Sequence, residues 1–186
     1  MTYTFHYDSP LGGITIASNG TGITGLWFDG QKYFGLTLPE HYEEKELPIF
    51  EETRRWLDIY FSGREPDFTP LLSMETTDFR RAVWDILLTI PFGKTMTYGE
   101  IADKIAEKKG VARMSAQAVG GAVGHNAISL IIPCHRVVGA NGSLTGYAGG
   151  IEKKQKLLAM EKQMFGKDEA ENVTVQTEIK ASDARY

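Results

Sequence analysis

The chain has 186 residues, of which 42% are hydrophobic and 24% charged, close to the globular average, which argues against general disorder or a collagen-like repeat. No apolar run approaches the ~20 residues of a membrane span, and the first residues lack the basic and apolar segments of a signal peptide. The single cysteine excludes an intrachain disulfide and a multi-cysteine zinc site, and it fits a reducing cytoplasm. We therefore expect one compact domain or two small ones, with no metal, cofactor or membrane partner.

The net charge of −4 is unevenly distributed along the chain. Residues 1–75 carry 5 Lys and Arg against 12 Asp and Glu, whereas residues 76–161 carry 11 against 7. A basic segment after an acidic one indicates that only the later part meets a polyanion. By itself the shift is weak support, because mixed solvated surfaces are the more common explanation.

The first third of the chain is typical of β-structure. Residues 3–7 alternate aromatic and polar side chains, the period of a half-buried strand. Apolar runs follow at residues 14–17 and 23–28, and the Asn19 and Gly20 pair between them favours a hairpin turn. We therefore predict a small antiparallel sheet.

A helix follows the predicted sheet and closes the first domain. Phe50, Leu57 and Tyr60 share one face of an amphipathic helix over residues 47–61. We place the domain boundary near residues 70–77. The predicted organisation is an α/β domain over residues 1–75, a mainly helical domain over residues 76–165 and a polar tail over residues 166–186.

The second part is mostly helical. Apolar spacing predicts a helix over residues 79–90, and Thr97 with Glu100 forms the capping box of a shorter one. Ser115 is a suitable N-cap for another helix, and the connection over residues 108–113 is strongly basic. The two short helices are a helix-turn-helix or two packed core helices with a solvated loop, and their spacing leaves both open.

The remaining segments surround the cysteine. The mostly apolar run over residues 128–133 predicts a short buried strand that ends at a proline, with Cys134 at the edge of the strand. The glycine-rich residues 139–150 form a hairpin wing or a loop that a ligand approaches closely. A last helix is expected from Ile151 to Met164, and the residues expected to face inward are Ile151, Leu157 and Leu158.

A lone buried cysteine is usually an inert small hydrophobe, but the neighbours of Cys134 argue otherwise. His135 and Arg136 follow it directly, and cationic neighbours favour the thiolate. Neighbouring side chains on an extended strand point to opposite faces. A Cys134–His135 pair therefore needs a turn or a bridging water.

Several motifs around this cysteine occur together in one order. They are Phe92-Gly93 before Thr97-Tyr98, Ala118 to Ala122, Asn126, Ile131 to Val138, Gly146 to Gly150, and Leu157-Leu158 before Glu161. This pattern, over roughly residues 76–161, resembles the O6-alkylguanine-DNA alkyltransferases, also called methylated-DNA–protein-cysteine methyltransferases. The resemblance implies a ribonuclease-H-like α/β first domain, with a small antiparallel sheet plus a helix, and a mainly α winged-helix second domain.

The resemblance also implies a mechanism. The damaged nucleotide is flipped out of the duplex, and Cys134 accepts its alkyl group irreversibly, so each molecule reacts once. Glu161 polarises His135, which takes the thiol proton through water. Asn126 holds the turn beside the cysteine. The implied substrate is O6-alkylguanine, and possible activity on O4-alkylthymine stays open.

The implied partner is double-stranded DNA, bound by a monomer. The helix over residues 115–124 enters the minor groove, Tyr98 contacts the phosphate of the flipped nucleotide, and basic residues of the 108–113 loop reach other phosphates. The implied DNA- and substrate-binding residues are Tyr98, Ser115, Gln117, Ala118, Gly121, Arg136, Tyr147 and Ala148. At position 117 the family often has Arg, which replaces the flipped base, whereas this chain has Gln.

Two other functions compete with this reading. A non-catalytic alkyltransferase-like protein would bind the lesion without repairing it, but such relatives lack the cysteine that stands here at position 134. A thiol hydrolase unrelated to DNA would turn over repeatedly. The presence of Cys134 within the whole motif set favours the single-turnover alkyltransferase.

Overall fold

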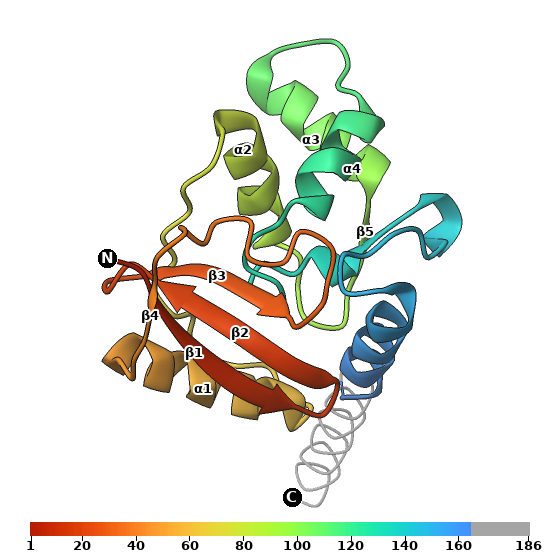
Figure 1. Cartoon of the computed structure of the whole chain (residues 1–186). Coiled ribbons are helices and arrows are strands. Elements are labelled where there is room, and N and C mark those ends of the chain that lie inside the picture. The colour runs from red at the N-terminus through yellow and green to blue at the C-terminus, as the bar shows by residue number, and fades with distance from the viewer. Residues whose placement is uncertain (165–186) are drawn as a thin grey trace, which may run out of the picture.

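The computed structural model describes residues 1–164 and begins with a four-stranded sheet (Figure 1). Its strands are β1 (Tyr3–Ser9), β2 (Gly12–Ser18), β3 (Ile23–Phe28) and the short β4 (Glu43–Glu44). The order is β3-β2-β1-β4, with β1–β2 and β2–β3 antiparallel and β1–β4 parallel. The antiparallel sheet predicted from the sequence is therefore present, and a short parallel edge pair extends it to a mixed sheet.

The predicted helix packs against this sheet as α1 (Pro48–Phe61), which contacts β1 and β2. Pro48 suits the first turn, because its missing N–H has no partner inside a helix at that position. Phe50, Leu57 and Tyr60 are all buried, as their helical spacing predicts. One face of α1 therefore forms the core of the first domain.

The second half contains α2 (Asp78–Leu87), α3 (Tyr98–Lys109) and α4 (Ala116–Gly124), which gather on one side of the sheet in Figure 1. The side chains of Thr77, Thr97 and Ser115 cap the three N-termini, and the capping box of Thr97 and Glu100 forms as predicted. β5 (Met96–Thr97) and β6 (Val137–Val138) pair in parallel below these helices.

The two halves share one core. The Leu26 N–H of β3 donates to the carbonyl of Ala127 at 2.8 Å, and the Ser129 N–H donates back to Leu26 at 2.9 Å. A single buried cluster of apolar side chains contains residues from both halves. The segment that precedes Cys134 is therefore fixed directly to the edge strand of the first domain.

Residues 128–133 do not form the predicted strand. Apart from one bridge at Ile128, they make turns, and Leu130 has a left-handed φ of 69°. Cys134 then begins a 3-10 turn, η1 (Cys134–Arg136), instead of standing at a strand edge. The buried backbone groups here bond to Leu26 and to the Asn126 side chain, which replaces a ladder of strand hydrogen bonds.

The glycine-rich residues 139–150 form a loop with the 3-10 turn η2 (Ala140–Gly142), not a hairpin wing. Residues 151–164 are helical, as predicted, and lie beside the sheet and α1 in Figure 1. Lys154, Leu157 and Glu161 form the buried face of this helix, whereas Ile151 is 37% exposed, so its predicted inward position is wrong. The predicted polar tail lies outside the described residues.

Candidate active site

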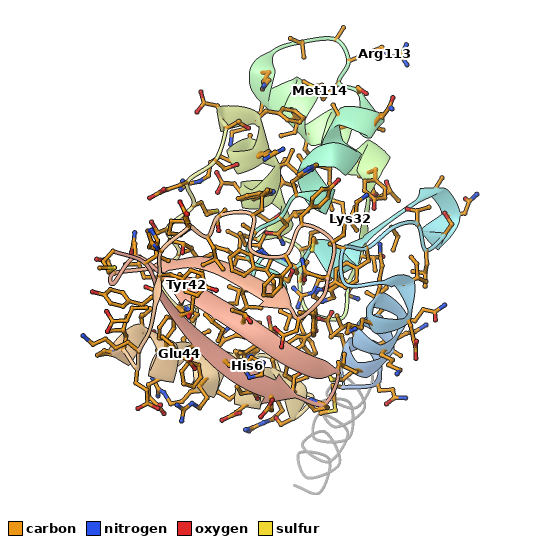
Figure 2. All side chains as sticks on the ribbon, viewed as in Figure 1. His6, Lys32, Tyr42, Glu44, Arg113 and Met114 are labelled. Carbon is orange, nitrogen blue, oxygen red and sulfur yellow. The ribbon has the colours of Figure 1, made fainter. Side chains whose placement is uncertain are left out.

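A pocket of about 390 Å³ lies where the loop after β3 meets the helical half. Lys32, at the junction of the two halves in Figure 2, comes from the first domain. The residues that line the pocket are Lys32, Tyr33, Tyr98, Gly120, Gly121, Val123, Gly124, His125, Cys134, Gly146, Tyr147 and Ala148. The pocket therefore combines the only thiol of the chain with side chains from both domains.

Cys134 lines this pocket and is 5% exposed. Burial raises the pKa of the thiol, and the Asn126 side chain and the positive charge of Lys154 offset only part of that effect. At neutral pH the sulfur therefore carries its proton. A reaction that needs the thiolate requires a base beside it.

Asn126 holds the turn that leads to the cysteine. Its side-chain amide donates to the carbonyl of Ile132 at 2.8 Å, and its carbonyl oxygen accepts from the Ile128 N–H at 3.0 Å. The side chain thus bridges both ends of the 128–132 segment. This is the position that the sequence resemblance implies for Asn126.

His135 is fully buried and points its Nε2 atom at Glu161, whose Oε1 atom is 2.7 Å away. An ionised carboxylate only accepts hydrogen bonds, so Nε2 of the neutral ring carries the proton and Nδ1 keeps a free lone pair. Nδ1 has no hydrogen-bond partner among residues 1–164. Burial lowers the pKa of His135 despite the opposing charge of Glu161, which favours the neutral ring that can accept a proton.

Glu161 is the centre of a buried charged cluster. Arg136 Nε lies 2.9 Å from its Oε2 atom, Arg136 Nη2 lies 3.0 Å from its Oε1 atom, and the Gly93 N–H donates to Oε2 at 3.3 Å. Burial alone would raise the pKa of Glu161, but His135 and Arg136 outweigh it and lower the pKa to about 2. Glu161 is therefore ionised throughout the neutral range.

The structure places Arg136 in this cluster and not on a DNA-facing surface. Its side chain is buried, and Nη1 donates to the carbonyl of Ile90 at 2.8 Å. Within residues 1–164 its guanidinium contacts Ile90 and Glu161, because the 3-10 turn directs it inward beside His135. The DNA- or substrate-binding role expected for Arg136 has no support in this geometry.

Tyr60 also belongs to the cluster, although the sequence marked it only as part of a helix face. Its hydroxyl donates to Glu161 Oε1 at 2.8 Å and lies 3.3 Å from His135 Nε2. Because Tyr60 and Glu161 are 101 positions apart, no local pattern connects them.

Lys154 is a second residue that the sequence analysis missed. Its ammonium group is buried and donates to the carbonyls of Val137, Thr145 and Gly146, at 2.5, 3.0 and 3.2 Å. It therefore fixes the glycine-rich loop against the residues that follow the cysteine. Its spacing of i, i+3 and i+7 with Leu157 and Glu161 is the signal that could have identified it.

Helix α4 presents small residues toward the pocket. A Cβ atom on Gly121 would meet nothing within 4 Å, and one on Gly120 would lie 3.9 Å from the Tyr98 ring. Ala118 and Gln117 are exposed at the start of the helix, and the Ser115 hydroxyl accepts from the Ala118 N–H at 3.2 Å. Tyr98 and Gly121 line the pocket, whereas Ser115, Gln117 and Ala118, at the N-terminal end of α4, are not among its lining residues.

The pocket lining also contains Tyr147, Ala148 and two residues of the first domain. The Lys32 N–H donates to the Ala148 carbonyl at 3.0 Å, and the Tyr33 ring stacks on His125 with the ring centres 4.1 Å apart. Tyr147 and Ala148 therefore occupy the pocket as expected, while the participation of Lys32 and Tyr33 was not predicted.

The basic residues 108–113 lie at the far end of the α3–α4 connection. Figure 2 shows Arg113 at its outer tip, directed away from the rest of the protein. Lys108 and Arg113 are exposed, and Lys109 Nζ lies 5.2 Å from the centre of the Phe79 ring. This connection is a separate basic surface beyond the pocket.

Within residues 1–164, no helix is both long and apolar enough to cross a membrane. Within the same residues, no group of three His, Cys, Asp or Glu side chains is arranged to hold a metal ion.

Two family models match the chain in succession. Residues 1–73 match the ribonuclease-like domain of 6-O-methylguanine DNA methyltransferase, and residues 78–163 match its DNA-binding domain. The chain is 45% identical over 161 residues to the methylated-DNA–protein-cysteine methyltransferase of Mycobacterium bovis, covering 84% of this chain and 92% of that protein. It is 42% identical to the Haemophilus influenzae protein of the same name, covering 86% of each.

Solved structures show the same similarity. The O6-methylguanine methyltransferase of Mycobacterium tuberculosis matches with a TM-score of 0.76 and 43% identity, over 88% of this chain and 94% of that one. A complex of the M. tuberculosis protein OGT with DNA matches with a TM-score of 0.74 and 42% identity, over 88% and 93%. The similarity therefore covers most of both domains.

Proposed function

The chain belongs to the 6-O-methylguanine DNA methyltransferase family, and we propose that it repairs DNA by moving an alkyl group from guanine O6 to the Cys134 thiol. It binds DNA through the second domain, in which α3 and α4 form the helix-turn-helix. We expect it to act as a monomer in the cytoplasm, where a reducing environment keeps the single thiol free.

The reaction is a displacement at the alkyl carbon. The Cys134 sulfur attacks this carbon, a sulfur–carbon bond forms, and the carbon–O6 bond breaks with its electron pair left on guanine. The thiol gives up one proton, and the departing guanine takes up one proton. The thioether is permanent, so the protein reacts once.

His135 is the base of this proposal. Its Nδ1 lone pair accepts the thiol proton through a water molecule, while the Nε2–H remains bonded to the Glu161 carboxylate. The imidazolium that forms is stabilised by an ionised carboxylate 2.7 Å away. Asn126 holds the turn that presents the sulfur to the pocket.

The DNA reaches the pocket by nucleotide flipping. Helix α4 approaches the minor groove with its exposed small residues, Gln117 occupies the space of the flipped base, and Tyr98 contacts its phosphate. Tyr147 and Ala148 border the guanine. The exposed Ser115, Ala118 and Gly121 allow close contact with the DNA backbone.

The observation that carries this proposal is the Cys134 thiol at the wall of a pocket, with the adjacent His135 buried and hydrogen-bonded to Glu161. The test is mass spectrometry after incubation with a duplex that contains one O6-methylguanine. We expect one added methyl group, about 14 Da, on the peptide that contains Cys134. The Cys134→Ser variant should bind the duplex and gain no mass.

Three outcomes would contradict the proposal. Binding of the lesion without transfer would indicate a non-catalytic lesion-binding protein. Repeated release of product from one protein molecule would indicate a hydrolase. A methyl group on another residue would show that Cys134 is not the acceptor.

A further inference from the structure

Tyr60 joins the first domain to the residues that activate the cysteine. It belongs to α1, yet its hydroxyl reaches Glu161 Oε1 at 2.8 Å and His135 Nε2 at 3.3 Å. The Tyr60 hydroxyl, Glu161 Oε1 and His135 Nε2 therefore each lie within hydrogen-bond distance of the other two. We propose that Tyr60 is a positioning residue for alkyl transfer, which holds Glu161 and His135 in the arrangement that leaves His135 Nδ1 free for the Cys134 proton.

The packing around Tyr60 leaves its hydroxyl one position. The side chain is fully buried, its ring stacks on Trp56 at 5.3 Å with an interplanar angle of 7°, and the Phe92 ring meets it edge-on at 6.1 Å. A buried phenol packed against these two rings has little room to turn away from the carboxylate. The orientation of Glu161 therefore depends on a helix from the other domain.

The hydrogen-bond directions explain how this contact acts. The Tyr60 O–H donates to Glu161 Oε1, so the phenol oxygen still offers a lone pair to the His135 Nε2–H. The Glu161 Oε1 atom and the Tyr60 oxygen both lie within hydrogen-bond distance of His135 Nε2, and these two acceptors keep the ring proton on that nitrogen. Burial and the negative charge of Glu161 raise the pKa of Tyr60, so it stays a proton donor across the working range.

Loss of the Tyr60 hydroxyl should change the pKa of His135. Other charged or titratable groups face this cluster, namely Arg136 and Cys134 of the 3-10 turn, Tyr147 of the glycine-rich loop and Lys154 of the last helix. All of them remain in Tyr60→Phe. The Glu161 carboxylate loses one donor, attracts the His135 proton more strongly and raises the pKa of His135.

The inference rests on the proposed role of the Cys134–His135–Glu161 group, and a reaction without DNA tests it independently. Cys134 is the only thiol in the chain, so the rate of alkylation by iodoacetamide reports on this residue alone. For Tyr60→Phe we expect a rate about tenfold lower at neutral pH, the typical effect of one hydrogen bond to a charged group. The acidic limb of the pH–rate profile should move to higher pH.

A control variant separates the contact at the site from the loss of a tyrosine hydroxyl in general. Tyr7→Phe removes a similar bond, from the Tyr7 hydroxyl of β1 to Asp58 Oδ1 of α1 at 2.7 Å, outside the site. This variant should lower the melting temperature and leave the acidic limb where it is.

An unchanged rate and acidic limb in folded Tyr60→Phe would overturn the inference, and so would an equal shift in Tyr7→Phe. Methyl transfer from an O6-methylguanine duplex, measured in parallel, tests the function separately. If the wild-type protein accepts no methyl group, the proposed function fails, while the iodoacetamide series still decides whether Tyr60 governs the reactivity of Cys134.

Discussion

At the scale of single residues, the site depends on a buried carboxylate that several neighbours share. Glu161 accepts hydrogen bonds from the consecutive residues His135 and Arg136 and from Tyr60, which lies far from both in the sequence. Isolated buried charges are costly, but this one is matched by a guanidinium and by neutral donors. The same contacts give His135 one tautomer, so Glu161 takes part both in a structural ion pair and in the proposed catalytic arrangement.

Replacing Glu161 by Gln should therefore affect both rate and stability. The proposed base loses its polarising partner, and single-turnover methyl transfer should slow by ~10²–10⁴. Arg136 loses its counter-ion while it stays buried, which should lower the free energy of unfolding by about 3–5 kcal/mol. Rapid-quench single-turnover kinetics measure the rate of methyl transfer, and urea unfolding measures the free energy of unfolding.

The control for this variant lies on the same helix. Glu152 forms an exposed pair with Lys156 at 3.0 Å, so Glu152→Gln should change stability by less than about 1 kcal/mol and leave the rate intact. If Glu161→Gln reacts at the wild-type rate while folded, Glu161 serves the fold alone.

Gln117 is the residue at which this chain departs from the pattern that it resembles. It is exposed on α4 and lies outside the pocket lining, as expected for a side chain that enters the DNA stack. Gln117→Ala should slow methyl transfer from a duplex and spare the reaction with free O6-benzylguanine, which needs no flipping. Gln117→Arg should strengthen duplex binding by roughly 1 kcal/mol, because the new guanidinium adds a positive charge and a flat stacking surface at the DNA.

The ratio of the duplex rate to the free-base rate decides the role of Gln117. An equal loss of both rates in Gln117→Ala would assign the residue to the fold or the pocket and reject a part in flipping.

At the scale of elements, two glycines lower the stability of α4 and leave its surface beside the pocket open. Gly120 and Gly121 stand inside a nine-residue helix, where each glycine costs about 1 kcal/mol relative to alanine. Gly121 has ordinary backbone angles and open space where a Cβ would stand, so packing does not require it. The absent side chain instead leaves room at the mouth of the pocket.

Gly121→Ala should therefore stabilise the protein and impair repair. We expect the free energy of unfolding to rise by about 0.5–1 kcal/mol, since alanine restricts the unfolded chain. Methyl transfer from duplex DNA should slow, because the added methyl group occupies the approach surface. Thermal unfolding and single-turnover kinetics on the same samples measure both effects.

A second helical glycine provides the comparison. Gly99 lies in α3 outside the pocket, and its Cβ would meet only the Thr97 hydroxyl at 3.8 Å. Gly99→Ala should leave the rate unchanged. Faster or equal repair by Gly121→Ala would show that DNA does not approach this face.

At the scale of the whole molecule, charge is divided between the domains. The acidic half contains the sheet, where Figure 2 shows Glu44 at the edge, and the basic half contains α3, α4 and the connection that ends in Arg113. We expect this division to orient the protein on a polyanion, because the acidic half is repelled from it. The net charge of −4 does not reveal this unequal distribution of charge between the two halves.

Affinity for duplex DNA should fall as salt rises, with a slope of about −0.9 in log K against log salt for each phosphate neutralised. Arg113→Gln should reduce the slope by about one unit if this side chain contacts a phosphate. Lys45→Gln, beside β4 in the acidic half, should leave the slope unchanged. Fluorescence anisotropy across a salt series measures this, and binding that is independent of salt would reject the electrostatic orientation.

The sequence by itself determined the elements with local signals. Apolar periodicity located α1 and the last helix, the capping box located the start of α3, and Ser115 located the start of α4. These signals succeed because a cap or a helical face involves residues within a few positions. Motif order also identified the family to which the chain belongs, and the roles drawn from it for Cys134, His135 and Glu161 stay predictions.

Only the tertiary structure decided which distant groups meet. The turns at residues 128–133 replace a predicted strand because their backbone bonds go to Leu26 and Asn126. Arg136 turns inward to Glu161, and Tyr60 reaches the same carboxylate from the other domain. A hydrogen bond between remote segments leaves no periodicity in either one, because it depends on how the two domains pack and not on neighbouring residues.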